Sequence, residues 1–216
     1  MRSNYFQQLK ELNILLLKMG AMVQNIIETA VQGLAKQDLQ MARQVYELDD
    51  AIDELELKIE QECMSLLALQ QPMAKDLRVI GTILKIITDL ERMGDYAVNI
   101  AKVTLDIGDT PLIKPLIDIP KMATLTENMV KKSLDAFMKA DVDLAEEVAH
   151  DDEAVDRLYE DIYMELINMM IENPEIIQQA THLLFTGRYL ERIADHATNI
   201  GERIIYMKTG KIVKIN

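Results

Sequence analysis

The chain has 216 residues, of which 36 are acidic and 23 basic, so its formal net charge is −13. Hydrophobic residues make up 49% of the sequence, which supplies a core and excludes an intrinsically disordered chain. The acidity argues against a nucleic-acid-binding protein, because contacts to phosphates need a basic surface. It favours cations, or partners that carry basic patches.

Few prolines interrupt the chain, and between them the apolar residues follow helical spacing. Leu48, Ile52 and Leu55, for example, recur every three or four positions, which predicts an amphipathic helix. Asp38 and Asp141 are residues of the type that caps helix N-termini, and each divides a long helical stretch into a hairpin. We therefore predict six helices, near residues 4–36, 38–70, 73–107, 118–139, 141–172 and 175–208.

The second half of the sequence repeats the first. A shift of 103 residues aligns Asp49 with Asp152, and after Pro72 a shift of 100 aligns Glu91 with Glu191. Repeated units of three long helices predict an all-α protein of two tandem, similar three-helix bundles, comparable to spectrin repeats. The predicted division is a first repeat at 1–107, a linker at 108–120 and a second repeat at 121–216.

The polar residues that recur in both halves form stripes along helix faces. Residues four apart share one face of a helix, and like charges at that spacing repel each other. Four carboxylates in each half at such positions predict a compensating cation, and carboxylate and amide oxygens suit Mg²⁺, Mn²⁺, Ca²⁺ or iron. The predicted metal ligands are Asp49, Asp53, Glu91, Asp95 and Asn99 in the first half, and Asp152, Asp156, Glu191, Asp195 and Asn199 in the second.

A simpler interpretation is that the stripes are solvated. In that case Arg92 and Lys102 pair with the carboxylates at the surface and no metal binds. Glu56 and Glu60 do not recur in the second half, so we expect them on a solvated face rather than among the ligands.

The remaining reactive residues predict no further site. Cys63 lies in an apolar stretch and is expected to be a buried core residue. Glu147 and His150 have the Glu-x-x-His spacing of di-iron bundles, but such sites need that motif twice, and a surface position is expected. His196 receives no role. The apolar run 14–17 is too short to cross a bilayer, so we expect no membrane insertion and a cytoplasmic location.

Residues 89–100 (DLERMGDYAVNI) and 189–200 (YLERIADHATNI) resemble the paired signatures of the PhoU family of phosphate-signalling regulators. The length, the doubled three-helix layout and the acidic stretch 49–53 also match. The resemblance covers essentially the whole chain. The second signature departs from the first at Ala194, where the first has Gly94, so the two helix pairs are expected to pack differently there.

The resemblance implies multinuclear clusters of iron or zinc on the bundle surface, one held by each half. It further implies a cytoplasmic negative regulator of phosphate uptake, without catalytic residues, that forms a homodimer. Its implied partners are the ATPase of a phosphate ABC transporter and a sensor histidine kinase.

Two other functions compete with this adaptor. One is a carboxylate-bridged metalloenzyme, either an oxidase or a phosphatase, since two neighbouring metals can activate water or hold phosphate. The other is a purely structural bundle with solvated acidic faces.

Overall fold

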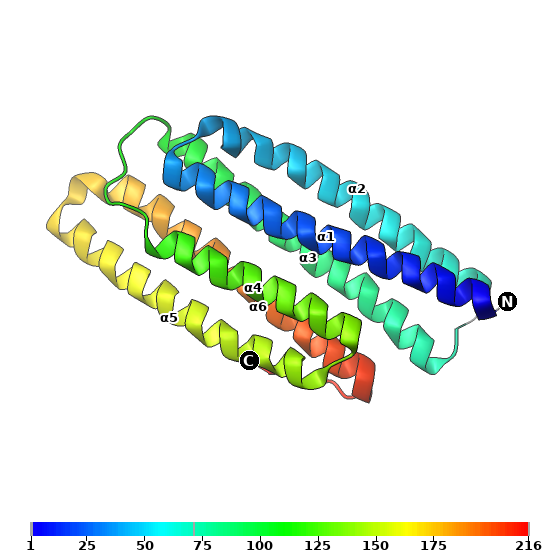
Figure 1. Cartoon of the computed structure of the whole chain (residues 1–216). Coiled ribbons are helices and arrows are strands. Elements are labelled where there is room, and N and C mark those ends of the chain that lie inside the picture. The colour runs from blue at the N-terminus through cyan, green and yellow to red at the C-terminus, as the bar shows by residue number, and fades with distance from the viewer. Residues whose placement is uncertain (1, 71, 216) are drawn as a thin grey trace.

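The computed structural model describes residues 2–70 and 72–215, so the outer limits of the predicted repeats at 1 and 216 lie outside it. All the regular structure in the described part is helical, which confirms the all-α prediction (Figure 1). The sixth helix starts slightly later than predicted, because Pro174–Ile176 forms a short 3₁₀ turn in front of it. The helices are α1 (Arg2–Lys36), α2 (Leu39–Gln70), α3 (Ala74–Ile107), α4 (Asp118–Lys139), α5 (Val142–Glu172) and α6 (Ile177–Thr209), with the 3₁₀ turn labelled η1.

The two aspartates predicted as N-caps perform that role. The Asp141 carboxylate accepts a hydrogen bond from the Leu144 N–H at 3.1 Å. The Asp38 carboxylate accepts bonds from the N–H groups of Gln40 and Met41 at 2.9 and 3.0 Å. These N–H groups have no partner within their own helix, so the side chains satisfy them and fix where α2 and α5 begin.

The helices form two three-helix bundles that lie side by side, as the repeat predicted. Helices α1 to α3 pack together, α4 to α6 pack together, and the bundles meet where α3 packs on α6 and α1 on α4 (Figure 1). Apolar side chains fill both bundles and the contact between them. Cys63 is fully buried in this core, as expected, and burial together with nearby Glu62 raises the pKa of its thiol to about 12.

Helices α3 and α6 run antiparallel along their contact. Their register is marked by three pairs: Arg78 with Met207, Asp89 with His196, and Tyr96 with Tyr189. The Arg78 guanidinium donates to the Met207 carbonyl at 3.2 Å, the Asp89 carboxylate lies 2.9 Å from the His196 ring, and the two tyrosine rings stack. The last two pairs belong to the repeated signatures, so these signatures meet where the two bundles join.

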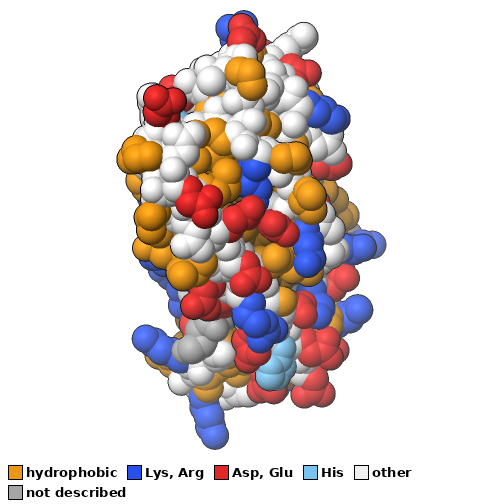
Figure 2. Space-filling model, turned by 90° about the vertical axis from the view of Figure 1, so that its left-hand side faces the viewer, with side chains coloured by type: hydrophobic (Ala, Val, Ile, Leu, Met, Phe, Trp, Pro, Cys, Tyr) orange, Lys and Arg blue, Asp and Glu red, His pale blue; other side chains and the backbone are white. Residues whose placement is uncertain are grey.

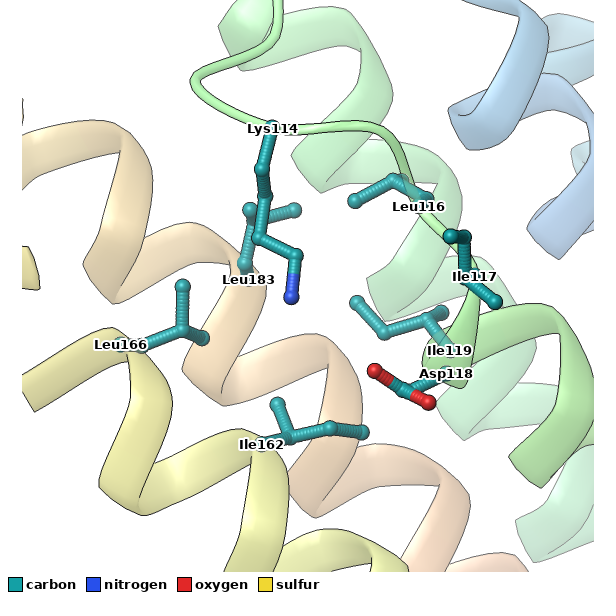
Figure 3. Close-up of a pocket in the computed structure, with 8 residues that line it drawn as sticks. All are labelled: Lys114, Leu116, Ile117, Asp118, Ile119, Ile162, Leu166 and Leu183. Carbon is teal, nitrogen blue, oxygen red and sulfur yellow. The ribbon is translucent and has the colours of Figure 1, made fainter.

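The segment between the bundles is packed rather than loose. The side chain of Gln179 in α6 forms two hydrogen bonds with the backbone of this segment, and Lys114 of the segment pairs with Glu165 of α5. Figure 3 shows Lys114 and the apolar side chains of this segment over α5 and α6, around a cavity of only about 10 Å³. Helix α4 begins at Asp118, so residues 118–120 of the predicted linker are helical.

Helix α1 as a whole is much longer than the apolar run 14–17 that was considered in the sequence. The run 14–17 is short, but the helix over Tyr5–Lys36 contains a window with a mean hydropathy of 1.4 and is long enough to cross a membrane by length and composition. In the structure 44% of that window is buried, and Leu12, Leu16 and Met19 lie in the core. A core helix passes the same test because it is apolar on the face that it buries.

Replacing glycine by alanine should have opposite effects on stability at Gly201 and at Gly81. A Cβ at Gly201 would lie 2.9 Å from the Ala145 carbonyl oxygen, whereas a Cβ at Gly81 meets no atom within 4 Å. We expect Gly201→Ala to lower the free energy of unfolding by about 1–3 kcal/mol through overpacking. Gly81→Ala should raise it by up to about 1 kcal/mol, because alanine favours the helix. Denaturant unfolding measures both, and an unchanged Gly201→Ala variant would contradict this packing.

Candidate metal centres

The carboxylates predicted in the first half gather on one surface of α2 and α3. Burial first, and then repulsion from Asp53, Asp95, Glu91 and Asp50, raises the pKa of Asp49 to about 6. The pKa values of Asp53 and Glu91 are raised as well, first by burial and then by Asp95. The two helices therefore bring all four predicted carboxylates into one negative field, which we call the first acidic cluster (Asp49, Asp53, Glu91 and Asp95).

Gly94 allows Asp49 to approach α3 closely. A Cβ built on Gly94 would lie 2.8 Å from the Asp49 Oδ1, so any larger residue would displace that carboxylate. The corresponding residue in the second half is Ala194, whose methyl group occupies the equivalent space. Asp152, which corresponds to Asp49, is only 2% exposed, while Asp49 is half-buried. The two halves therefore place this carboxylate differently.

In the second half, Asp156, Glu191 and Asp195 form a comparable group on α5 and α6. Burial and then Asp195 raise the pKa values of Asp156 and Glu191, and Asp156 adds to the effect on Glu191. Arg188 opposes both shifts. We call Asp156, Glu191 and Asp195 the second acidic cluster, and Asp152 lies buried on the same helix as Asp156.

Arginines supply much of the counter-charge in the structure. Arg92 lies 2.9 Å from the Asp95 carboxylate and 3.5 Å from that of Glu91. Arg192 repeats this arrangement at 2.8 Å from Asp195 and 3.7 Å from Glu191. The sequence had pointed to Arg92 as a surface partner in the simpler interpretation, and its repeat in the signature extends the same role to Arg192.

The donor set of carboxylates and amides suits a hard or intermediate cation. Within residues 2–70 and 72–215, no three acidic, histidine or cysteine side chains stand in an arrangement that holds a metal ion. Asn99 accepts a hydrogen bond from Lys102 at 3.3 Å, and Asn199 lines a cavity with Asp195. The fit to a cation rests on Asp49, because after burial every group that raises its pKa is another carboxylate. Metal ligation by the ten predicted residues stays a prediction.

Some residues of these surfaces were missed from the sequence. Glu56 was expected on a solvated face, but it is half-buried and raises the pKa of Glu91. His196 was given no role, yet it contacts Asp89 across the two bundles. Neither residue recurs in the other half, so the repeat carried no signal for them. Glu147 and His150 lie at the surface, as expected.

The fold and these surfaces define a class of protein: two tandem three-helix repeats, each with an acidic cluster beside the helix that joins the bundles. Known proteins of this class match the chain closely. The PhoU domain matches it twice, over residues 16–104 and 119–204. The chain therefore belongs to the PhoU family.

Individual relatives match over nearly their full length. The chain is 42% identical over 216 residues to the phosphate-specific transport system accessory protein PhoU homolog of Clostridium acetobutylicum, covering all of this chain and 99% of that protein. The homolog from Aquifex aeolicus is 43% identical over 209 residues, which are 97% of this chain and 95% of that one. The crystal structure of PhoU from Pseudomonas aeruginosa superposes with a TM-score of 0.90 at 37% identity, over 96% of this chain and all of the other.

The raised pKa of Asp49 predicts a pH effect in the metal-free protein. The folded value is about 6, above the value of about 4 for an unfolded aspartate. The folded state thus binds the proton more tightly, and stability is lost as the pH rises from about 4 through about 6. We expect Asp49→Asn to melt at a higher temperature than the wild type at neutral pH, with the difference vanishing near pH 4.

The exposed Glu54 on the same helix provides the control. Glu54→Gln removes the same charge outside the first acidic cluster and should change the melting temperature little at either pH. Equal effects of the two substitutions at neutral pH would show that Asp49 experiences no special repulsion.

Proposed function

We propose that this protein is a non-enzymatic regulator of phosphate transport that binds metal through its acidic clusters and acts as an adaptor between partner proteins. The observation that carries the proposal is the first acidic cluster, in which burial and the neighbouring carboxylates of Asp53, Asp95 and Glu91 raise the pKa of Asp49. The membership of the chain in the PhoU family, whose relatives are named as accessory proteins of phosphate-specific transport systems, supplies the biological setting.

The acidic clusters favour metal binding because a cation would reduce the repulsion among their carboxylates. A cation between α2 and α3 would offset the repulsion among the carboxylates of both helices. The arginines offset this repulsion only at the edge of each cluster. Asp49, Asp53, Glu91 and Asp95, with Asn99 one turn further along, would hold it in the first half. Asp152, Asp156, Glu191, Asp195 and Asn199 would do so in the second. Iron and zinc are the metals that the family resemblance favours, and Mg²⁺, Mn²⁺ and Ca²⁺ suit the same oxygens.

The adaptor role fits the shape and surface of the molecule. Two long bundles side by side offer extended faces, and Figure 2 shows one face on which acidic side chains lie among exposed apolar ones. Such a face suits a partner with basic and apolar patches. We propose as partners the ATPase of a phosphate ABC transporter and a sensor histidine kinase, bound in the cytoplasm by a homodimer to restrain phosphate uptake.

A carboxylate-bridged metalloenzyme is the second candidate, since the same clusters contain the donors for it. Against this alternative stands the Glu-x-x-His motif of di-iron bundles, which such sites need twice. It occurs once in the sequence, at Glu147 and His150, and these two side chains lie at the surface.

Metal removal tests the role of the clusters. Wild type loaded with Fe²⁺, Zn²⁺ or Mn²⁺ should melt at a higher temperature than the chelated protein, because binding to the folded state alone stabilises by about 2.7 kcal/mol at a hundredfold excess over Kd.

Glu91→Gln combined with Asp95→Asn should lower the bound metal measured by elemental analysis and leave the second half loaded. Glu160→Gln combined with Asp161→Asn removes the same charge from exposed positions on α5 and serves as the control. Equal metal content in all three proteins would reject the assignment.

Partner binding separates the adaptor from an enzyme. Association with the transporter ATPase should slow as salt rises, because exposed charges are screened beyond about 8 Å at physiological ionic strength. Chelation should weaken the complex, while phosphatase and oxidase assays on the same preparation show no turnover. Metal-dependent turnover that Asp95→Asn abolishes would establish the metalloenzyme instead.

A further inference from the structure

A groove between α3 and α6 has a character unlike the rest of this acidic protein. It encloses a cavity of about 330 Å³ between the first half of α3, the last turns of α6 and the segment after α6. Three basic side chains line it: Arg78 and Lys85 from α3 and Arg203 from α6. It therefore lies where the two bundles join, apart from the acidic clusters.

The positive charge in this groove is not neutralised by the protein. In the described part of the chain no carboxylate lies within ion-pair distance of Arg78, Lys85 or Arg203, in contrast to Arg92 and Arg192. Arg78 donates from its Nε to the Met207 carbonyl, which leaves the other N–H groups of its guanidinium for further partners. The Arg203 Nε is buried and has no hydrogen-bond partner, a costly state that a ligand would relieve.

One acidic side chain, Glu202, is among the described residues that line the groove. Its carboxylate accepts a hydrogen bond from the Ile215 N–H at 3.2 Å and so holds the C-terminal segment in place. Three positive charges and one negative charge leave a balance of about two positive charges. That balance matches a phosphate monoester, which carries about −1.5 to −2 at neutral pH, better than a single carboxylate.

The basic residues are not part of the repeated architecture. At the shift of 100 residues that aligns the two signatures, Arg78, Lys85 and Arg203 stand opposite Gln178, Phe185 and Val103. The symmetry-related positions at the other end of the α3–α6 contact thus lack all three charges. Building a helical bundle does not require them, so their convergence calls for a local explanation.

The other walls of the groove are apolar. Leu77, Tyr206 and Val213 line it, and Leu77 and Tyr206 are 50% and 38% exposed. Inorganic phosphate would leave these walls wet and the cavity largely empty. A cavity of about 330 Å³ lies at the lower end of the range of roughly 300–1,000 Å³ for small-molecule sites.

We propose that this groove binds a small organic phosphate, with the phosphate group held by Arg78, Lys85 and Arg203 and the organic group packed against Leu77 and Tyr206. The guanidinium forks suit bidentate contacts to phosphate oxygens. The site joins the two repeats, so its occupancy bridges α3 and α6. This inference depends neither on metal binding nor on the proposed adaptor role.

Calorimetric titration of the full chain with naphthyl phosphate tests the site. Naphthyl phosphate should bind at least about tenfold more tightly than inorganic phosphate, because only the former uses the apolar walls. Arg203→Gln should weaken binding about tenfold, the cost of removing one charged hydrogen-bond partner. Arg43→Gln, an exposed arginine on α2, is the matched control and should bind as the wild type does.

Gly81 allows the groove to be closed without disturbing the fold. A Cβ there points into open space, so Gly81→Phe should fill the cavity and abolish naphthyl phosphate binding while the circular dichroism and melting temperature stay close to the wild-type values. Gly81→Ala leaves the cavity open and should retain binding. If Gly81→Phe unfolds, Lys85→Gln decides the same question, because Lys85 is exposed at the rim of the groove.

The proposal is overturned by any of three results: no binding of naphthyl phosphate to the wild type, equally tight binding of inorganic phosphate, or undiminished binding in the Arg203→Gln variant.

Discussion

The antiparallel packing of α3 against α6 is the contact on which the rest of the molecule depends. Each of these helices carries one copy of the repeated signature, and each completes its own bundle on one side while facing the other bundle on its other side. The small residues Gly94 and Gly201 let neighbouring groups approach these helices closely. The packing of α3 against α6 forms the basic groove, while the packing of α2 on α3 and of α5 on α6 forms the two acidic clusters.

A second contact between the bundles, that of α1 with α4, is less well matched electrostatically. Glu127 of α4 is half-buried beside Glu28 of α1, and burial followed by this repulsion raises the pKa of Glu127 to about 7. Apolar packing in the same contact offsets the repulsion between Glu127 and Glu28, since Leu134 of α4 lies directly against Gly20 of α1. The α3–α6 contact, with its stacked tyrosines and the Asp89–His196 pair, is the better satisfied of the two.

The acidic clusters illustrate how a duplicated sequence can give two unequal sites. Both copies keep the Glu–Arg–x–x–Asp spacing, and in both the arginine pairs with the aspartate three residues later. Among the differences between the copies is Gly94 in the first half and Ala194 in the second, and Gly94 lets the Asp49 carboxylate lie close to α3. Arg188, which pairs with Glu191 at 2.6 Å, further reduces the repulsion in the second half. A cation would therefore meet a more negative site in the first half.

The sequence by itself determined the helices, their caps and the doubled arrangement. These features are local or periodic: Asp38 and Asp141 cap helices through neighbours two or three residues away, and the spacing of Glu91 and Asp95 fixes their common face. The tertiary structure alone decided which surfaces of distant helices meet. Helical periodicity gives the face on which a residue lies but not the register of that face against a helix from the other half. For that reason the pair Asp89 with His196 and the meeting of Arg78, Lys85 and Arg203 in one groove depend on the packing of α3 against α6. The half-buried Glu56 depends in the same way on the packing of α2 against α3.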